Sequence, residues 1–131
     1  MRAESDPARK LTIYADAITE IHQRTAPLFL ALRDASTTDG EALQVWQRIN
    51  DRRARNMRDL VHELGPNGTL RAGLSPNEAA DTIWATASTE LFILLTRDRK
   101  WSPDTYRQWL ANTWNRLLLD NTQTGSATSP P

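Results

Sequence analysis

Apolar residues recur at intervals of three or four along most of this chain, a spacing typical of amphipathic helices. Ser102 and Pro103 mark the start of the clearest one, because a serine hydroxyl accepts a hydrogen bond from a backbone N–H of the first turn and proline fits the first helical position. The pattern predicts a helix from about 103 to 119. The apolar and aromatic stripe of this helix consists of Tyr106, Trp109, Leu110, Thr113, Trp114, Leu117 and Leu118.

A helix with the same kind of start precedes it. Ser75 and Pro76 repeat the cap, and Glu78 stands where it completes a capping box. The stripe then continues without interruption, so we expect one continuous helix from 76 to about 95. Its members are Ala79, Ala80, Ile83, Trp84, Ala87, Leu91, Leu94 and Leu95.

The N-terminal half predicts three further helices. Asp6 and Pro7 begin one that runs to about 23, and Pro27 is expected to break or bend what precedes it, because proline lacks an N–H and clashes with the preceding turn. A short helix over 26–35 is apolar nearly all round and is therefore expected to be buried. A long helix over 41–64 ends at a Gly-Pro-Asn-Gly stop signal.

Together these segments predict an all-α fold of five helices in one domain over residues 1–120. No alternation of polar and apolar positions suggests a strand. Residues 121–131 are rich in Thr, Ser, Gly and Pro, with almost nothing to bury. This composition predicts a disordered tail.

Composition and charge exclude several classes of function. With 16 basic and 16 acidic side chains the net charge is zero, which argues against a large nucleic-acid footprint. There is no cysteine, and His22 and His62 lie far apart in sequence, so neither a disulfide nor a metal site is expected. No apolar run approaches the roughly 20 residues of a membrane span, and no signal peptide is visible. We expect a cytoplasmic protein without a membrane partner.

Catalytic patterns are also missing from the sequence. There is no Ser/His/Asp set, no close carboxylate pair and no glycine-rich phosphate loop. Asp81 and Glu90 lie too far apart on their predicted helix to share acid–base work. We therefore expect neither an enzyme nor a cofactor.

Four arginines between residues 52 and 58 form the one basic run of the chain. Their positions spread around the helix, and Asp51 and Asp59 are interleaved with them. A solvated, partly ion-paired helix face explains this pattern better than a nucleic-acid patch does.

Several of these segments, taken together, resemble a known family. They are Leu74-Ser75-Pro76-Asn77-Glu78-Ala79-Ala80-Asp81, Thr89-Glu90-Leu91-Phe92-Ile93-Leu94-Leu95-Thr96, Trp101-Ser102-Pro103-Asp104-Thr105-Tyr106-Arg107-Gln108-Trp109-Leu110, and the pair 11–15 and 24–28. The chain is similar to the C-terminal ligand-binding and dimerisation domain of tetracycline-repressor (TetR) family transcriptional regulators. The likeness covers most of residues 6–119.

The resemblance implies a sensor for a small hydrophobic effector in a transcriptional repressor, with the last two helices forming a four-helix bundle across a homodimer. In the family, DNA binding belongs to an N-terminal three-helix head. Nothing before Asp6 predicts a helix-turn-helix, so no direct DNA binding by this chain is expected. A fragment, a truncated gene product and a natural stand-alone domain all fit this pattern.

Aromatic and polar residues on the inner helices are the candidate ligand contacts, since small-molecule sites are mostly apolar with a few placed polar groups. The arginine at position 53 suits an anionic or carbonyl-bearing effector. For the histidine at position 22, a hydrogen-bonded core residue is the more common alternative. The candidates are Tyr14, Ile18, His22, Phe29, Trp46, Arg53, Met57 and Trp84.

The stripes of the last two helices are the candidate dimer interface, because aromatic residues are enriched at interface centres. Their alternative role is the core of a single chain. The candidates are Ala80, Ala87, Leu91, Tyr106, Trp109, Leu110, Trp114 and Leu117. A rival function is a helical interaction module with a filled core and no ligand, for example a partner that inactivates an intact regulator by pairing with it. A cavity of roughly 300–1,000 Å³ among Tyr14, Phe29, Met57 and Trp84 would favour the sensor, whereas close packing there would favour the rival.

Overall fold

The computed structural model describes residues 6–65 and 69–120, and in these ranges the fold is all-α with five α-helices and no strands. The predicted tail over 121–131 lies outside the described residues. A π-helical segment, η1, follows the fourth helix. The elements are α1 (Pro7–Ala35), α2 (Gly40–Glu63), α3 (Pro76–Thr86), α4 (Thr89–Ile93), η1 (Leu94–Asp98) and α5 (Pro103–Leu118).

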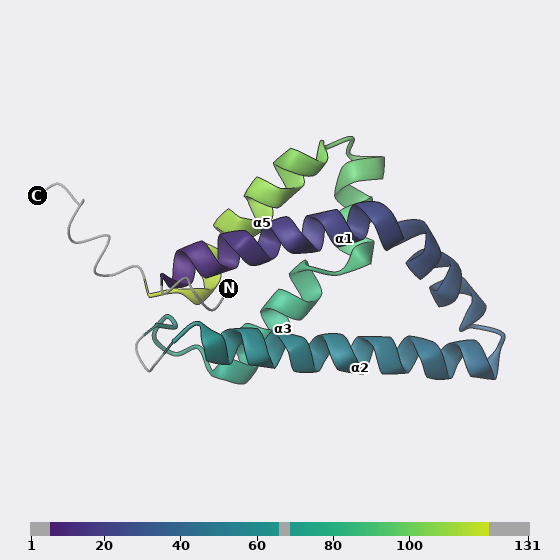
Figure 1. The fold of residues 1–131 in the computed structure, drawn as a ribbon, viewed down its shortest axis with the longest axis horizontal. Coiled ribbons are helices and arrows are strands. Elements are labelled where there is room, and N and C mark those ends of the chain that lie inside the picture. Colours follow the sequence, from purple (N-terminus) through teal and green to yellow (C-terminus); the bar gives the residue numbers. More distant parts are fainter. Residues whose placement is uncertain (1–5, 66–68, 121–131) are drawn as a thin grey trace, which may run out of the picture.

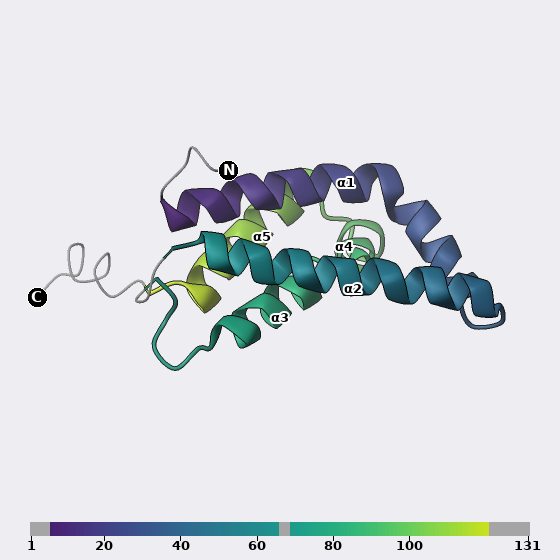
Figure 2. The same cartoon turned by 60° about the horizontal axis from the view of Figure 1, so that its bottom comes forward.

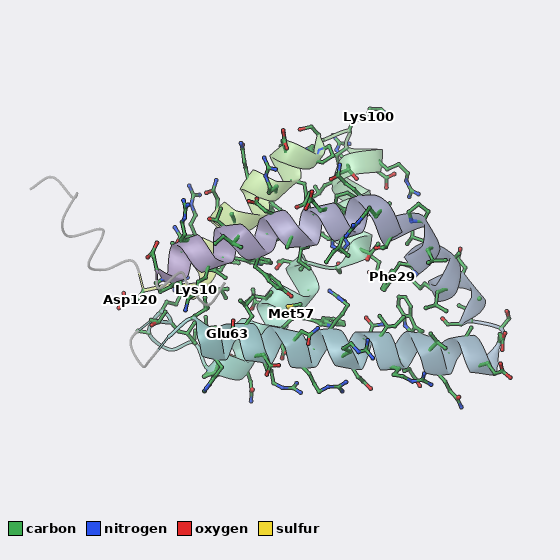
Figure 3. All side chains as sticks on the ribbon, viewed as in Figure 1. Lys10, Phe29, Met57, Glu63, Lys100 and Asp120 are labelled. Carbon is green, nitrogen blue, oxygen red and sulfur yellow. The ribbon has the colours of Figure 1, made fainter. Side chains whose placement is uncertain are left out.

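The two long helices form an antiparallel hairpin, and the shorter helices cover it (Figure 1). α5 packs along α1, α3 packs along α2, and α4 contacts α1. Figures 1 and 2 both show the tip of the hairpin, where α1 ends and α2 begins, projecting beyond the shorter helices. At the opposite end, the Lys10 ammonium donates a hydrogen bond to the Glu63 carbonyl (Figure 3).

The hydrophobic core lies between α1 as far as Ala26, the second half of α2 and the shorter helices. Trp114 and Tyr106 are its largest fully buried side chains. The core side chains are Leu11, Ala15, Ile18, Ala26, Met57, Leu60, Val61, Leu64, Ala79, Ala80, Ile83, Ala87, Phe92, Tyr106, Leu110, Trp114, Leu118 and Leu119. None of the described helices is both long enough and apolar enough to cross a membrane.

Three predicted helix starts are confirmed. The Ser75 hydroxyl accepts from the backbone N–H of Glu78, whose carboxylate accepts from the backbone N–H of Ser75 in return. Ser102 caps α5 and Asp6 caps α1, each ahead of a proline. A side-chain cap satisfies a backbone N–H that the helix itself cannot pair, so these sequences fix where the chain enters each helix.

The predicted boundary between helices over 6–23 and 26–35 is wrong, whereas the bend expected as the alternative effect of Pro27 is present. α1 is one helix of 29 residues with Pro27 inside it, and its ribbon bends in its C-terminal part (Figure 1). Proline removes one hydrogen bond and crowds the preceding turn, which bends a helix where neighbouring contacts hold both parts. Beyond the bend, the Phe29 ring packs 4.7 Å from the ring of Trp46 on α2.

The apolar run over 28–32 is not the buried helix that the sequence predicts. Leu28 is 75% exposed, Ala31 is exposed, and Phe29 and Leu30 are partly buried. This segment belongs to the projecting tip, where only α2 is available to cover it. An apolar segment is expected to pack against other parts of the protein, but here only α2 covers it, on one side.

The single helix predicted for 76–95 is also wrong. α3 ends at Thr86, and α4 begins at Thr89 after a new cap, in which the Ser88 hydroxyl accepts from the backbone N–H of Leu91 over 3.1 Å. After α4 the chain continues as the π-helical segment η1, which ends at Asp98. Lys100, two residues later, has a left-handed backbone conformation with φ 62°. The break leaves carbonyl groups at the end of α3 that other elements must satisfy.

Candidate functional site

Three side chains from three different helices converge on the end of α3. His22 of α1 bonds through Nε2 to the Ala87 carbonyl over 2.7 Å, and Arg53 of α2 donates to the Trp84 carbonyl over 3.1 Å. Tyr106 of α5 donates its hydroxyl to the Thr86 carbonyl over 3.4 Å. Side chains of α1, α2 and α5 thus stabilise the break between α3 and α4 through hydrogen bonds to its backbone carbonyls.

His22 is a core residue with both ring nitrogens in use. Its side chain is buried beside the ring of Phe92, with the ring centroids 5.1 Å apart. Burial lowers the pKa of His22 to about 4, although the hydrogen bond to Ala87 opposes this. A neutral ring that bonds a carbonyl through Nε2 carries its hydrogen there, so Nδ1 accepts from the Thr89 hydroxyl at 3.5 Å.

Arg53 is a partly buried cation whose hydrogen-bond partners are neutral. It donates to the side-chain oxygen of Asn50 over 3.3 Å and to the Trp84 carbonyl, and its guanidinium lies 5.3 Å from the centre of the Trp84 ring. Within the described ranges, no carboxylate lies within salt-bridge distance of it. Burial lowers the pKa of Arg53, and the more distant charge of Glu90 partly offsets this.

A pocket of about 430 Å³ opens beside this arginine, between α2 and the α3–α4 break. Its volume falls within the range of roughly 300–1,000 Å³ that is typical of small-molecule sites. The indole N–H of Trp84 is buried without a hydrogen-bond partner. It is the only such buried side-chain group in residues 6–65 and 69–120. The pocket is lined by Trp46, Gln47, Asn50, Asp51, Arg53, Trp84, Ser88 and Glu90.

The predicted ligand contacts fall into three groups. Trp46, Arg53 and Trp84 line this pocket, and Phe29 packs on Trp46 beside it. Tyr14 lines a separate pocket of about 250 Å³ between α1 and α2. The others are buried in the core: Ile18, His22 and Met57.

The single cavity that the sensor hypothesis anticipates among Tyr14, Phe29, Met57 and Trp84 is therefore divided. Figure 3 shows Phe29 and Met57 pointing into the space between α1 and α2. Met57, however, is only 2% exposed and accepts a hydrogen bond from the Tyr14 hydroxyl over 3.7 Å. Tyr14 and Trp84 consequently line two different pockets.

Five pocket residues were not among the candidates from the sequence: Gln47, Asn50, Asp51, Ser88 and Glu90. A signal for one of them exists, because positions 46, 50 and 53 lie on one face of a helix at the spacing i, i+4, i+7. For Ser88 and Glu90 the signal is the cap that starts α4, which an uninterrupted apolar stripe conceals.

The structure places most of the candidate dimer residues inside the single chain. Ala80, Ala87, Tyr106, Leu110 and Trp114 are each at most 2% exposed. The stripe of α5 faces α1, and the Trp114 ring lies 6.0 Å from the ring of Tyr14. Within the single chain the surfaces of these five residues are already covered, as their alternative role in the core requires. Leu91, Trp109 and Leu117 keep exposed surface.

Among the described residues, no group of three His, Asp or Glu side chains is arranged to hold a metal ion. Comparisons of the chain with protein families, with curated proteins and with solved structures found no match.

Proposed function

We propose that this chain is a small-molecule sensor domain that resembles the effector-binding domains of TetR-type transcriptional regulators, with its ligand in the pocket between α2 and the α3–α4 break. One observation carries the proposal. The pocket is lined by Trp84, whose indole N–H is buried without a hydrogen-bond partner, and by Arg53, a cation without an anionic partner whose guanidinium lies 5.3 Å from the centre of the Trp84 ring. Unpaired buried polar groups are costly in a folded protein, and a ligand that pairs with them recovers that cost.

The position of the pocket suggests how binding would be transmitted. Trp84 lies on α3, while Ser88 and Glu90 lie beyond the break, so a ligand contacts both sides of it. A ligand that binds one arrangement of α3 and α4 more tightly than another shifts the population towards that arrangement. The side chains that hold the break would carry the shift to α1, α2 and α5.

The test is a panel of planar aromatic compounds, neutral and charged, followed by calorimetry and by the NMR signals of the five indole N–H groups. We expect a binder to move the Trp84 indole signal, which the Trp84→Phe variant identifies by its loss. That variant keeps an aromatic ring but lacks the N–H, and should bind about tenfold more weakly. A panel without binders, or binding that leaves the Trp84 signal in place, would contradict the proposal.

The proposal includes a homodimer formed by the outer face of α5 together with α4. Trp109 and Leu117, eight residues apart on α5, and Leu91 on α4 keep exposed surface, and aromatic residues are common at interface centres. We expect light scattering to give twice the 14.8 kDa mass of the chain. Leu117→Glu should shift the mass towards the monomer, whereas Leu28→Glu, on the distant tip, should not. A monomeric wild type would remove the dimer from the proposal.

A second candidate function is an interaction module without a ligand. The exposed apolar side chains at the hairpin tip, Leu28, Leu43 and Val45, favour it. The two candidates differ in a measurable way, because only the sensor binds a compound at Trp84.

A further inference from the structure

We infer that the ligand is a planar aromatic compound with one carboxylate, which pairs with Arg53 and accepts a hydrogen bond from the Trp84 indole. This inference rests on the proposed function, because it concerns the same pocket. It goes beyond that function by naming the chemical class of the ligand.

The charge of Arg53 is the first argument. A guanidinium carries five N–H donors in a planar fork that matches a carboxylate. In the described residues, Arg53 bonds only to a side-chain amide oxygen and a backbone carbonyl, and both of these are neutral. A partly buried cation is stabilised most by a charge-assisted bond to an anion. The fold leaves that partner to be supplied by a ligand.

The walls of the pocket are the second argument. Trp46 and Trp84 line it from opposite elements, α2 and α3, and the Phe29 ring packs on Trp46 from α1. Indole rings bind flat apolar surfaces well, since stacked and edge-to-face ring contacts add to the burial of area. Trp84 also carries an indole N–H without a hydrogen-bond partner, and the centre of its ring lies 5.3 Å from the Arg53 guanidinium.

The acidic residues of the pocket limit the charge of the ligand. Glu90 lies 3.4 Å from Arg33 of α1, which partly neutralises it, and Asp51 is exposed. Both would repel additional negative charge, because like charges placed close together are costly. A single carboxylate on Arg53 is therefore favoured over a dicarboxylate or a phosphate.

The decisive experiment compares 2-naphthoate with 2-naphthamide by calorimetry at pH 7. The two probes have nearly the same shape and differ in charge. We expect the acid to bind about tenfold more tightly than the amide. Arg53→Gln should reduce this ratio to about one, and Glu90→Gln should strengthen binding of the acid. Arg55→Gln, an exposed arginine on the same helix, is the matched control and should change neither affinity.

Arg53→Lys separates the effect of charge from that of donor geometry, because lysine keeps the positive charge but lacks the planar fork of guanidinium N–H donors. It should keep part of the preference for the acid, and circular dichroism checks that each variant is folded. If the amide binds the wild type as tightly as the acid and moves the Trp84 signal, the ligand class is overturned while the sensor function stands. If neither the two probes nor any compound of the aromatic panel binds at millimolar concentration, the function fails and the ligand class fails with it.

Discussion

Trp114→Ala is expected to lower the free energy of unfolding by about 3–5 kcal/mol, as is typical when a large aromatic side chain is removed from a core. Trp114 is 0% exposed, packs near Tyr14, and donates its indole N–H to the Thr86 hydroxyl over 2.7 Å. The variant leaves a cavity between α1 and α5, the pair that carries much of the core. Urea unfolding followed by circular dichroism measures the loss.

Trp109→Ala is the matched control, on the same helix and with the same change of side chain. Its ring contacts Trp101 and Tyr106 but remains partly exposed, so its loss should cost less than half as much. Trp114→Phe retains most of the apolar volume, so its loss of unfolding free energy should lie between those of Trp114→Ala and Trp109→Ala. If Trp114→Ala instead lost little stability, and the midpoint of unfolding depended on protein concentration, Trp114 would belong to an interface between two chains.

The sequence determines the apolar stripe of α5 but not the surface that covers it. The stripe of α5 and its cap at Ser102 could be predicted because spacing and capping are local properties. The surface that covers the stripe could not, since an apolar stripe fits a core and an interface equally well. The choice depends on the position of α1, from which Tyr14 packs near Trp114 across 100 positions of the chain.

The break between α3 and α4 could not be predicted from the local sequence pattern. Ser88 offers a cap, but Ala87 and Leu91 continue the apolar stripe across it, so the local pattern favours one helix. What stabilises the break is distant: His22 satisfies the Ala87 carbonyl from 65 positions away, and Arg53 satisfies the Trp84 carbonyl from 31 positions away. Two of the eight pocket residues, Ser88 and Glu90, depend on this break for their position. From the sequence, Trp46, Arg53 and Trp84 could therefore be predicted as pocket residues, whereas Ser88 and Glu90 could not.

His22→Gln is expected to remove a large part of the dependence of stability on pH. Burial lowers the pKa of His22 from 6.5 to about 4, so the unfolded chain binds a proton in a pH range where the folded chain does not. The folded state is therefore fully favoured above pH 6.5 and loses stability as the pH falls towards 4. At about 1.4 kcal/mol for each pKa unit, the loss reaches about 3 kcal/mol.

Glutamine can still donate to the Ala87 carbonyl but does not titrate, so the variant separates the proton from the hydrogen bond. His62→Gln is the matched control: His62 is the other histidine of the chain and is exposed on α2, so its loss should leave the pH profile as it is. Glu78, whose pKa is lowered by its bond to Ser75, contributes equally in all three proteins. Thermal or urea unfolding at intervals from pH 7.5 to 4 measures the profiles. If the wild type lost no more stability than His22→Gln between pH 6.5 and 4, folding would not lower the pKa of His22, and the prediction would be wrong.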